Sequence, residues 1–289
     1  MRKRDKKIRT YVRRGIIVLL VLLYISPLIV TFTNSFMSQD EVSRNYSSMG
    51  DILHPGEKFV DMHLVPEMVT LSQYKQLLVE SPVYLHSFWN SMKIVVPVVL
   101  GQLAVSSMAA YAFTVLRFKG KEALFFLYII VMLLPLQVTL MPNYLMADWL
   151  GIKDSYLAII LPGIFNPFGT FLLRQSMKQI PRAYIEAAQI DGAGHWRIFT
   201  SIVLPMVKSG LAAVLMLTLM EYWNLIDQAV IFISDSEKQP LSTFLASINA
   251  EQIGVSFAGA SFFAFPALLV LLWGQDYLKD GIQLSGMKG

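Results

Sequence analysis

The sequence predicts an all-α integral membrane protein with six membrane-spanning helices. Of its 289 residues, 55% are hydrophobic and only 15% are charged, and the mean hydropathy is +0.52. Soluble domains usually contain about 25% charged residues, and a soluble chain could not bury so much apolar surface. Six stretches of the chain also approach the roughly 20 apolar residues that a helix needs to cross the hydrocarbon core.

The six predicted spans are residues 15–33, 94–116, 123–141, 156–173, 210–226 and 255–275. Eight Lys or Arg residues precede the first span, which has no charge and no clear cleavage site, so it is predicted to be a retained helix and not a signal peptide. The fifth span contains Glu221 and is followed by Asp227, two carboxylates that are costly at membrane depth.

The distribution of Lys and Arg predicts the orientation of the chain. Four segments hold 18 of the 24 basic residues: 1–14, 117–122, 174–209 and 276–289. Basic residues concentrate on the cytoplasmic side of membrane proteins, so both termini are predicted to be cytoplasmic, with 279–289 as a short tail. Residues 34–93 then form a long extracytoplasmic loop, too short for an independent domain.

The segment between the fourth and fifth spans, residues 174–205, predicts a short helix, a sharp turn and a second short helix at the inner membrane face. Pro181 suits the first turn of a helix. Gly192 is placed to end that helix in a left-handed conformation. The small side chains of Ala187 and Ala188 keep the first helix slim enough to enter a groove on another protein.

The same segment carries a spaced motif: Glu186-Ala187-Ala188, Asp191-Gly192-Ala193 and Ile202-x-Leu204-Pro205. It resembles the signature loop of permease subunits of binding-protein-dependent bacterial ABC importers. The resemblance implies a permease core over 94–278 in the bacterial cell membrane, and a coupling helix that docks into a partner ATPase. The contact residues it implies are Tyr184, Glu186, Ala187, Ala188, Asp191, Gly192 and Ala193. The alternative is an ordinary amphipathic linker in which Gly192 only stops a helix.

Further short matches resemble the carbohydrate-uptake branch of that family. They are Thr70-Leu71-x-x-Tyr74, Asn90-Ser91, Phe171-Leu172-Leu173-Arg174, Trp223-Asn224 and the end of the chain from Gln275 to Gly289. The end resembles that of the maltose-type permease with a C-terminal tail, which implies that Lys288 and Gly289 reach into the ATPase dimer interface. The alternative is a frayed terminus.

The resemblance implies several partners: a second, unlike permease subunit, an ATPase dimer, an extracytoplasmic solute-binding protein, a sugar or oligosaccharide, and membrane lipid, but no nucleic acid. The chain has no Gly-x4-Gly-Lys-Ser/Thr phosphate loop, since Gly120-Lys121 is followed by Glu122. We therefore expect a non-catalytic permease without a cofactor or metal of its own, and ATP and Mg²⁺ bound by the partner ATPase.

Polar residues in the fifth span predict a substrate pathway. Glu221, Asn224 and Gln228 would share one face of a continuous helix, with Asp227 close to it. Trp223 could stack on a sugar ring. These groups could instead hydrogen-bond between helices, as we expect for Gln137 and Asn166, or Trp223 could belong to an interfacial aromatic belt.

Three alternatives remain open at this point. The chain could be an ABC importer permease for another solute, such as an amino acid, a peptide or an anion. A secondary transporter would usually show related halves, and none is visible. A membrane-embedded enzyme would need a catalytic constellation, and the sequence offers none. The identity of the sugar is not encoded in any residue that we can single out.

Overall fold

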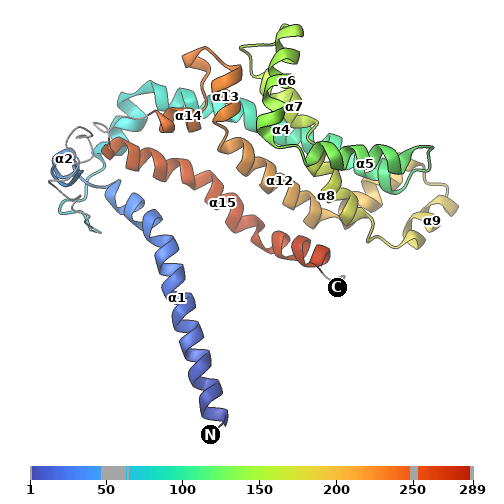
Figure 1. Cartoon of the computed structure of the whole chain (residues 1–289), viewed down its shortest axis with the longest axis horizontal. Coiled ribbons are helices and arrows are strands. Elements are labelled where there is room, and N and C mark those ends of the chain that lie inside the picture. Colours follow the sequence, from blue (N-terminus) through green and yellow to red (C-terminus); the bar gives the residue numbers. More distant parts are fainter. Residues whose placement is uncertain (1, 47–62, 64, 248–252, 287–289) are drawn as a thin grey trace. The chain divides into compact units, whose positions relative to one another are not determined.

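The computed structural model describes residues 2–46, 63, 65–247 and 253–286. Every regular element in these ranges is a helix and none is a strand, which confirms the predicted all-α class (Figure 1). The chain divides into two compact units, Met1–Leu85 with Leu245–Phe265, and His86–Phe244 with Pro266–Gly289. The motifs singled out between Glu186 and Gln228 all lie in the second unit.

The first unit begins with α1 (Arg2–Asn34), which contains the predicted span 15–33. Most apolar side chains of α1 between Tyr11 and Ile29 are exposed, as expected of a helix that faces lipid or another subunit. The unit continues with α2 (Gln39–Tyr46), α3 (Ser72–Lys75) and η2 (Gln76–Glu80), a π-helical turn. Its small core consists of Met37, Val42 and Tyr46, packed against Ile253 and Phe257.

The predicted second span lies in α4 (Pro82–Thr114), a 33-residue helix that begins twelve residues before the expected boundary at Ile94. The predicted third span, 123–141, is wrong as one continuous helix. It divides into α5 (Lys121–Met132) and α6 (Leu136–Trp149), which are bent by 103°. Pro135 lacks an N–H and disfavours helical backbone in the residue before it, so the chain turns there.

The predicted fourth span is also interrupted, although Leu157–Met177 as a whole is long and apolar enough to cross a membrane. It consists of α7 (Leu157–Ile164) and α8 (Pro167–Met177). The side chain of Asn166 accepts a hydrogen bond from the backbone N–H of Phe168, and Pro167 occupies the first helical position. This N-cap starts α8 afresh, so Asn166 has a structural role, but as a cap of its own helix and not through the hydrogen bond between helices that the sequence favoured.

The inner segment and fifth span form α9 (Arg182–Ile190), α10 (His195–Ile198), η3 (Phe199–Val203), α11 (Leu204–Met206) and α12 (Lys208–Trp223). α8 packs against both α5 and α12 (Figure 1). α7 approaches α4 and α12 closely, because a Cβ built on Gly163 would lie 2.9 Å from Val98 and 2.7 Å from the Tyr222 hydroxyl. Glycine at 163 therefore permits this packing.

The chain then forms α13 (Asp227–Phe232), η4 (Ser236–Lys238), α14 (Leu241–Ala246) and α15 (Ile253–Gly286). The loop after α13 is tied to Asp154, whose carboxylate accepts the backbone N–H groups of Ser234 and Asp235 at 2.9 and 3.2 Å. The backbone N–H of Glu237, and then Lys238, hold the pKa of Asp235 below its ordinary value. These contacts hold the α13–α14 loop against the α6–α7 loop.

Four helices in the described part of the chain are long and apolar enough to span a membrane: Tyr11–Asn34, Pro82–Thr114, Leu157–Met177 and Ile253–Tyr277. Two bent pairs, Lys121–Met132 with Leu136–Trp149 and His195–Met206 with Lys208–Trp223, bring the number to six if each pair is one span. The architecture is that of a multi-pass membrane protein, with the six-span count depending on those two pairs.

Candidate functional site

The helix α9 is set apart from α8 by a short non-helical connection that ends at Pro181. Pro181 has φ −59° and an extended ψ of 131°, so it precedes α9 as its N-cap and does not occupy the first turn. The predicted short helix is present as Arg182–Ile190, and the predicted second helix follows as α10 after a turn.

The end of α9 is a two-bond turn built around Gly192. The Ala193 N–H donates to the Ala188 carbonyl at 2.9 Å, and the Gly192 N–H donates to the Gln189 carbonyl at 3.0 Å. This is the Schellman pattern, which requires a left-handed residue after the C-cap, and Gly192 has φ +78°. The predicted role of Gly192 as the helix stop is confirmed.

The turn leads directly into α10 through Gly194, whose backbone is extended at φ −70° and ψ 161°. The first residue of α10, His195, is held from α4: its Nδ1 lies 3.0 Å from the hydroxyl of Tyr111. The ring of Tyr111 also packs on Phe199 at a centroid distance of 5.2 Å. The two short helices are thus fixed to the end of a long membrane helix.

A buried cluster holds this helix–turn–helix segment in place. Its members are Ala110, Tyr111, Leu173, Met177, Ile180, Ala188, Ile198, Phe199, Val203, Val207 and Val214. α9 contributes Ala188, with Ile185 partly buried one turn earlier on the same face. Ala188 was predicted to contact a partner. It is buried against the chain's own core and anchors α9, and its contact with a partner stays a prediction.

The outward side of the segment is apolar and exposed. Ile190 is 86% exposed, Trp196 68% and Tyr184 55%. Glu186, Ala187 and Asp191 are also exposed, and Ala193 is half-buried beside the turn. Ile190 and Trp196 were missed by the sequence interpretation. Their signal was present, because large apolar residues in a loop between two membrane spans need either a core or a partner.

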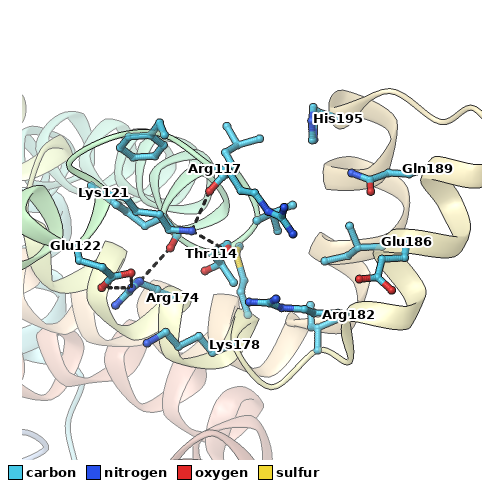
Figure 2. A pocket seen from close by; sticks show the side chains of 17 residues that line it. Thr114, Arg117, Lys121, Glu122, Arg174, Lys178, Arg182, Glu186, Gln189 and His195 are labelled. Atoms are coloured by element: carbon cyan, nitrogen blue, oxygen red, sulfur yellow. Dashed lines mark hydrogen bonds and ion pairs between the residues drawn. The ribbon is translucent and has the colours of Figure 1, made fainter.

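Arg174, near the C-terminal end of α8, contacts the C-terminal end of α4 (Figure 2). Its side chain is buried, donates from Nε to the Phe113 carbonyl at 3.2 Å and from Nη2 to both carboxylate oxygens of Glu122 at 3.0 Å. Its guanidinium also lies 3.6 Å from the centroid of the Phe125 ring. Arg174 therefore connects α8 to α4 and α5.

The proposed substrate residues do not share one helix face, because α12 ends at Trp223 and α13 begins at Asp227. Asn224 lies at the break as the C-cap of α12, and its side-chain amide donates back to the Met220 carbonyl at 2.8 Å. Glu221, Asn224 and Asp227 are exposed around this break, and Gln228 is half-buried. The prediction of a continuous polar stripe is wrong, although the polar groups remain neighbours along the chain.

Trp223 does not present its ring for stacking. It is 1% exposed and packs edge-on against Phe88 of α4 at a centroid distance of 6.0 Å. The alternative of a packing role holds for Trp223 in this structure, and Gln137 lies exposed in the first turn of α6. The tail residues Lys288 and Gly289 lie outside the described residues, so their role stays a prediction.

The profile of the family described as "Binding-protein-dependent transport system inner membrane component" matches residues 102–283, which include the α9 turn and the α12–α13 break. The chain belongs to this family. Its members are the non-catalytic permease components of importers, so the prediction of a permease that hydrolyses no ATP is confirmed by family membership.

Two relatives and one solved structure carry the likeness further. The chain is 27% identical over 274 residues to the arabinooligosaccharide transport permease AraQ of Bacillus subtilis strain 168, covering 94% of this chain and 93% of AraQ. It is 30% identical to the maltodextrin permease MdxG of the same strain, covering 76% and 81%. A bacterial ABC transporter for the acidic polysaccharide alginate shares the fold, with a TM-score of 0.80, 23% identity, and coverage of 95% and 98%.

Proposed function

We propose that this permease forms half of the translocation pathway of an ATP-driven ABC importer for a sugar or oligosaccharide. In this proposal α9 docks into a cleft of a separate ATPase subunit and transmits its movements to the membrane helices. The observation that carries the proposal is the geometry of α9. Ala188 of α9 and Ile198 of α10 are buried in the core with the membrane helices, whereas Tyr184 and Ile190 of α9 and Trp196 of α10 are exposed.

Mechanical coupling requires that α9 and α10 be firmly attached to the membrane helices and that they also expose apolar residues to a partner. Free energy passes between the ATPase and the permease only if the contact differs between two states of both. The carboxylates of Glu186 and Asp191 are exposed and would add orientation to the contact. Gly192 fixes the direction in which α10 leaves the turn. The connection between α9 and α10 is therefore rigid, and a movement of α9 would be transmitted through it.

The proposed topology has six spans with both termini in the cytoplasm. It is supported by the 18 of 24 basic residues that fall in segments 1–14, 117–122, 174–209 and 276–289. This arrangement places α9 on the cytoplasmic side, where an ATPase is found. The predicted absence of a cofactor in this chain, with ATP and Mg²⁺ on the ATPase dimer, belongs to the same proposal.

The proposed partners are a second, unlike permease subunit, an ATPase dimer and an extracytoplasmic solute-binding protein. The family description supports the binding protein, and the relatives' names support a carbohydrate substrate. A permease for another solute is the alternative. Glu221, at the exposed end of α12, is the residue we would place in the pathway. Unchanged uptake by a well-assembled Glu221→Ala variant would reject that role.

The decisive experiment is co-purification of the tagged chain, expressed with its neighbouring genes, from mild detergent. We expect wild type to bring down an ATPase and a second permease. Ile190→Glu should lose the ATPase and keep the second permease, because it places a charge at the most exposed large hydrophobic residue of α9. The exposed position of Ile190 means that the substitution leaves the chain's own core intact.

The matched control is Val230→Glu, which also replaces an exposed aliphatic residue by glutamate. Val230 lies in α13 and its side chain is 62% exposed. This variant should retain the ATPase. If Ile190→Glu and Val230→Glu retain it equally, α9 is not the docking element. If wild type itself purifies without an ATPase, the importer proposal fails and a secondary transporter has to be reconsidered.

A further inference from the structure

Beside α9 lies a cavity of about 790 Å³, which Ile190 and Trp196 do not line. This half-open cavity is lined by the end of α4, the start of α5, the end of α8, α9 and the first residue of α10. Five cationic side chains line it: Arg117, Lys121, Arg174, Lys178 and Arg182. Only two carboxylates, Glu122 and Glu186, line it as well, so three positive charges are in excess.

Two of the five cations are already used within the fold. Arg174 is paired with Glu122, and Lys121 donates to the carbonyls of Thr114 and Leu116 at 3.1 and 2.9 Å. These contacts close the end of α4 against α5. Arg174 and Lys121 therefore have partners within the fold, and the other three cations remain to be considered.

The side chains of the other three cations, Arg117, Lys178 and Arg182, are exposed and have no hydrogen bond or salt bridge within the part of the chain that the structure describes. Arg117 from the α4–α5 loop and Arg182 from α9 both extend into the space between these elements (Figure 2). Side chains of like charge that face one cavity repel each other, and a bound anion offsets that repulsion.

The rest of the lining is mixed: Thr114, Gln189 and His195 are polar, and the others are apolar, with Phe113, Phe118, Ile180 and Ile185 among them. A ligand that matches both parts has a compact anionic group for the cations and a less polar portion for the walls. Guanidinium groups are suited to phosphate, since their planar N–H donors match its oxygens. Basic pockets at the cytoplasmic ends of membrane helices suit phospholipid head groups for the same reason.

We propose that this cavity binds a phosphate group, carried by an anionic phospholipid or by a soluble phosphate ester, with Arg117, Lys178 and Arg182 as its ligands. The location at the inner membrane surface rests on the topology under the proposed function. Because Arg182 belongs to α9 and Arg117 to the α4–α5 loop, a bound phosphate would tie the coupling helix to the membrane helices.

The test uses the full-length chain purified in detergent and titrated with phosphatidylglycerol or phosphatidylcholine of equal chain length, read by native mass spectrometry. The cavity variant is Arg117→Gln with Lys178→Gln. The control variant is Lys119→Gln with Arg197→Gln, which removes two charges from exposed positions of the same two segments outside the cavity.

We expect wild type and control to bind phosphatidylglycerol about tenfold more tightly than phosphatidylcholine, and the cavity variant to lose most of that preference. A soluble source predicts a different result. Glycerol 2-phosphate would then raise the melting temperature of wild type and control but not of the cavity variant, with no preference between the two lipids.

The proposal is overturned if the cavity variant responds to phosphatidylglycerol and to glycerol 2-phosphate as wild type does. Its failure is separable from that of the proposed function. Phosphate binding is measured on the permease chain alone, and ATPase co-purification with Ile190→Glu is scored without added lipid.

Discussion

At the scale of single residues, the two glycines of the α9–α10 turn differ in why glycine is needed. Neither has an atom within 4 Å of the position that a Cβ would occupy, so space is not what requires glycine at either site. The difference is in the backbone. Gly192 has φ +78°, where a side chain is strained, and Gly194 has φ −70°, which any residue adopts.

We expect Gly192→Ala to cost about 1–2 kcal/mol in the turn, because the left-handed conformation brings Cβ too close to the backbone. Gly194→Ala should cost much less, and Gly192→Asn should recover most of the loss, since asparagine tolerates this conformation. The melting temperature of each purified variant measures the stability. Recovery of the ATPase with each variant measures the functional consequence. Equal losses for the two alanine variants would contradict the backbone explanation.

Burial at single positions distinguishes residues that could contact a partner from residues that pack in the chain's own core. Ala188 and Trp223 were predicted as contact residues for a partner and for a sugar, and both are buried in the chain's own core. Ile190 was passed over and proved to be the most exposed large residue of α9. A motif records which residue types occur together, but only packing decides which side of a short helix faces outward.

At the scale of elements, three of the predicted spans contain a helix break with an identifiable cause. Pro135 separates α5 from α6, the Asn166-Pro167 pair separates α7 from α8, and Asn224 ends α12. Hydropathy alone does not register these breaks, because each interrupting residue sits in an apolar neighbourhood. The Pro and Asn residues that interrupt the helices can be read in the sequence, but the change of chain direction that they bring about cannot.

The ends of α4, α5 and α8 are held together by Arg174, and we expect Arg174→Lys to destabilise the chain by about 1–3 kcal/mol. Lysine cannot reach the Phe113 carbonyl and Glu122 together, and it loses the planar contact with Phe125. The measurement is the melting temperature of the purified chain in detergent.

The matched control for this variant is Arg44→Lys. Arg44 pairs with Glu67 at 2.8 Å, but both side chains are more than half exposed. Exposed ion pairs contribute about 0–1 kcal/mol, so this substitution should change the melting temperature little. A similar shift for both variants would show that burial of Arg174 is not what makes its contacts strong.

At the scale of the whole molecule, the open question of topology is whether the two bent helix pairs cross the membrane. If both cross, the chain has six spans, and if both are re-entrant, it has four. The two arrangements put different segments on each side. With a cytoplasmic N-terminus, six spans place Lys153 outside and Ala183 inside, and four spans reverse both.

The chain has no cysteine, so single-cysteine mapping needs no altered background. We expect a membrane-impermeant maleimide to label Lys153→Cys in intact cells, and Ala183→Cys only after permeabilisation. Lys119→Cys and Glu237→Cys serve as inside and outside references, because both arrangements agree on them. Labelling of Ala183→Cys in intact cells would overturn the six-span topology, and with it the location of α9.

The sequence by itself determined the all-α membrane class, the family, the existence of the short helix at 182–190 and the glycine that stops it. These follow from local physics: hydropathy over 20 residues, helix-end chemistry, and the need for a glycine at positive φ. Only the tertiary structure decided that Ala188 and Trp223 face inward, that Ile190 faces outward, and that five cations from four elements line one cavity. Those facts depend on residues far apart in the chain, and no local pattern encodes which of them meet.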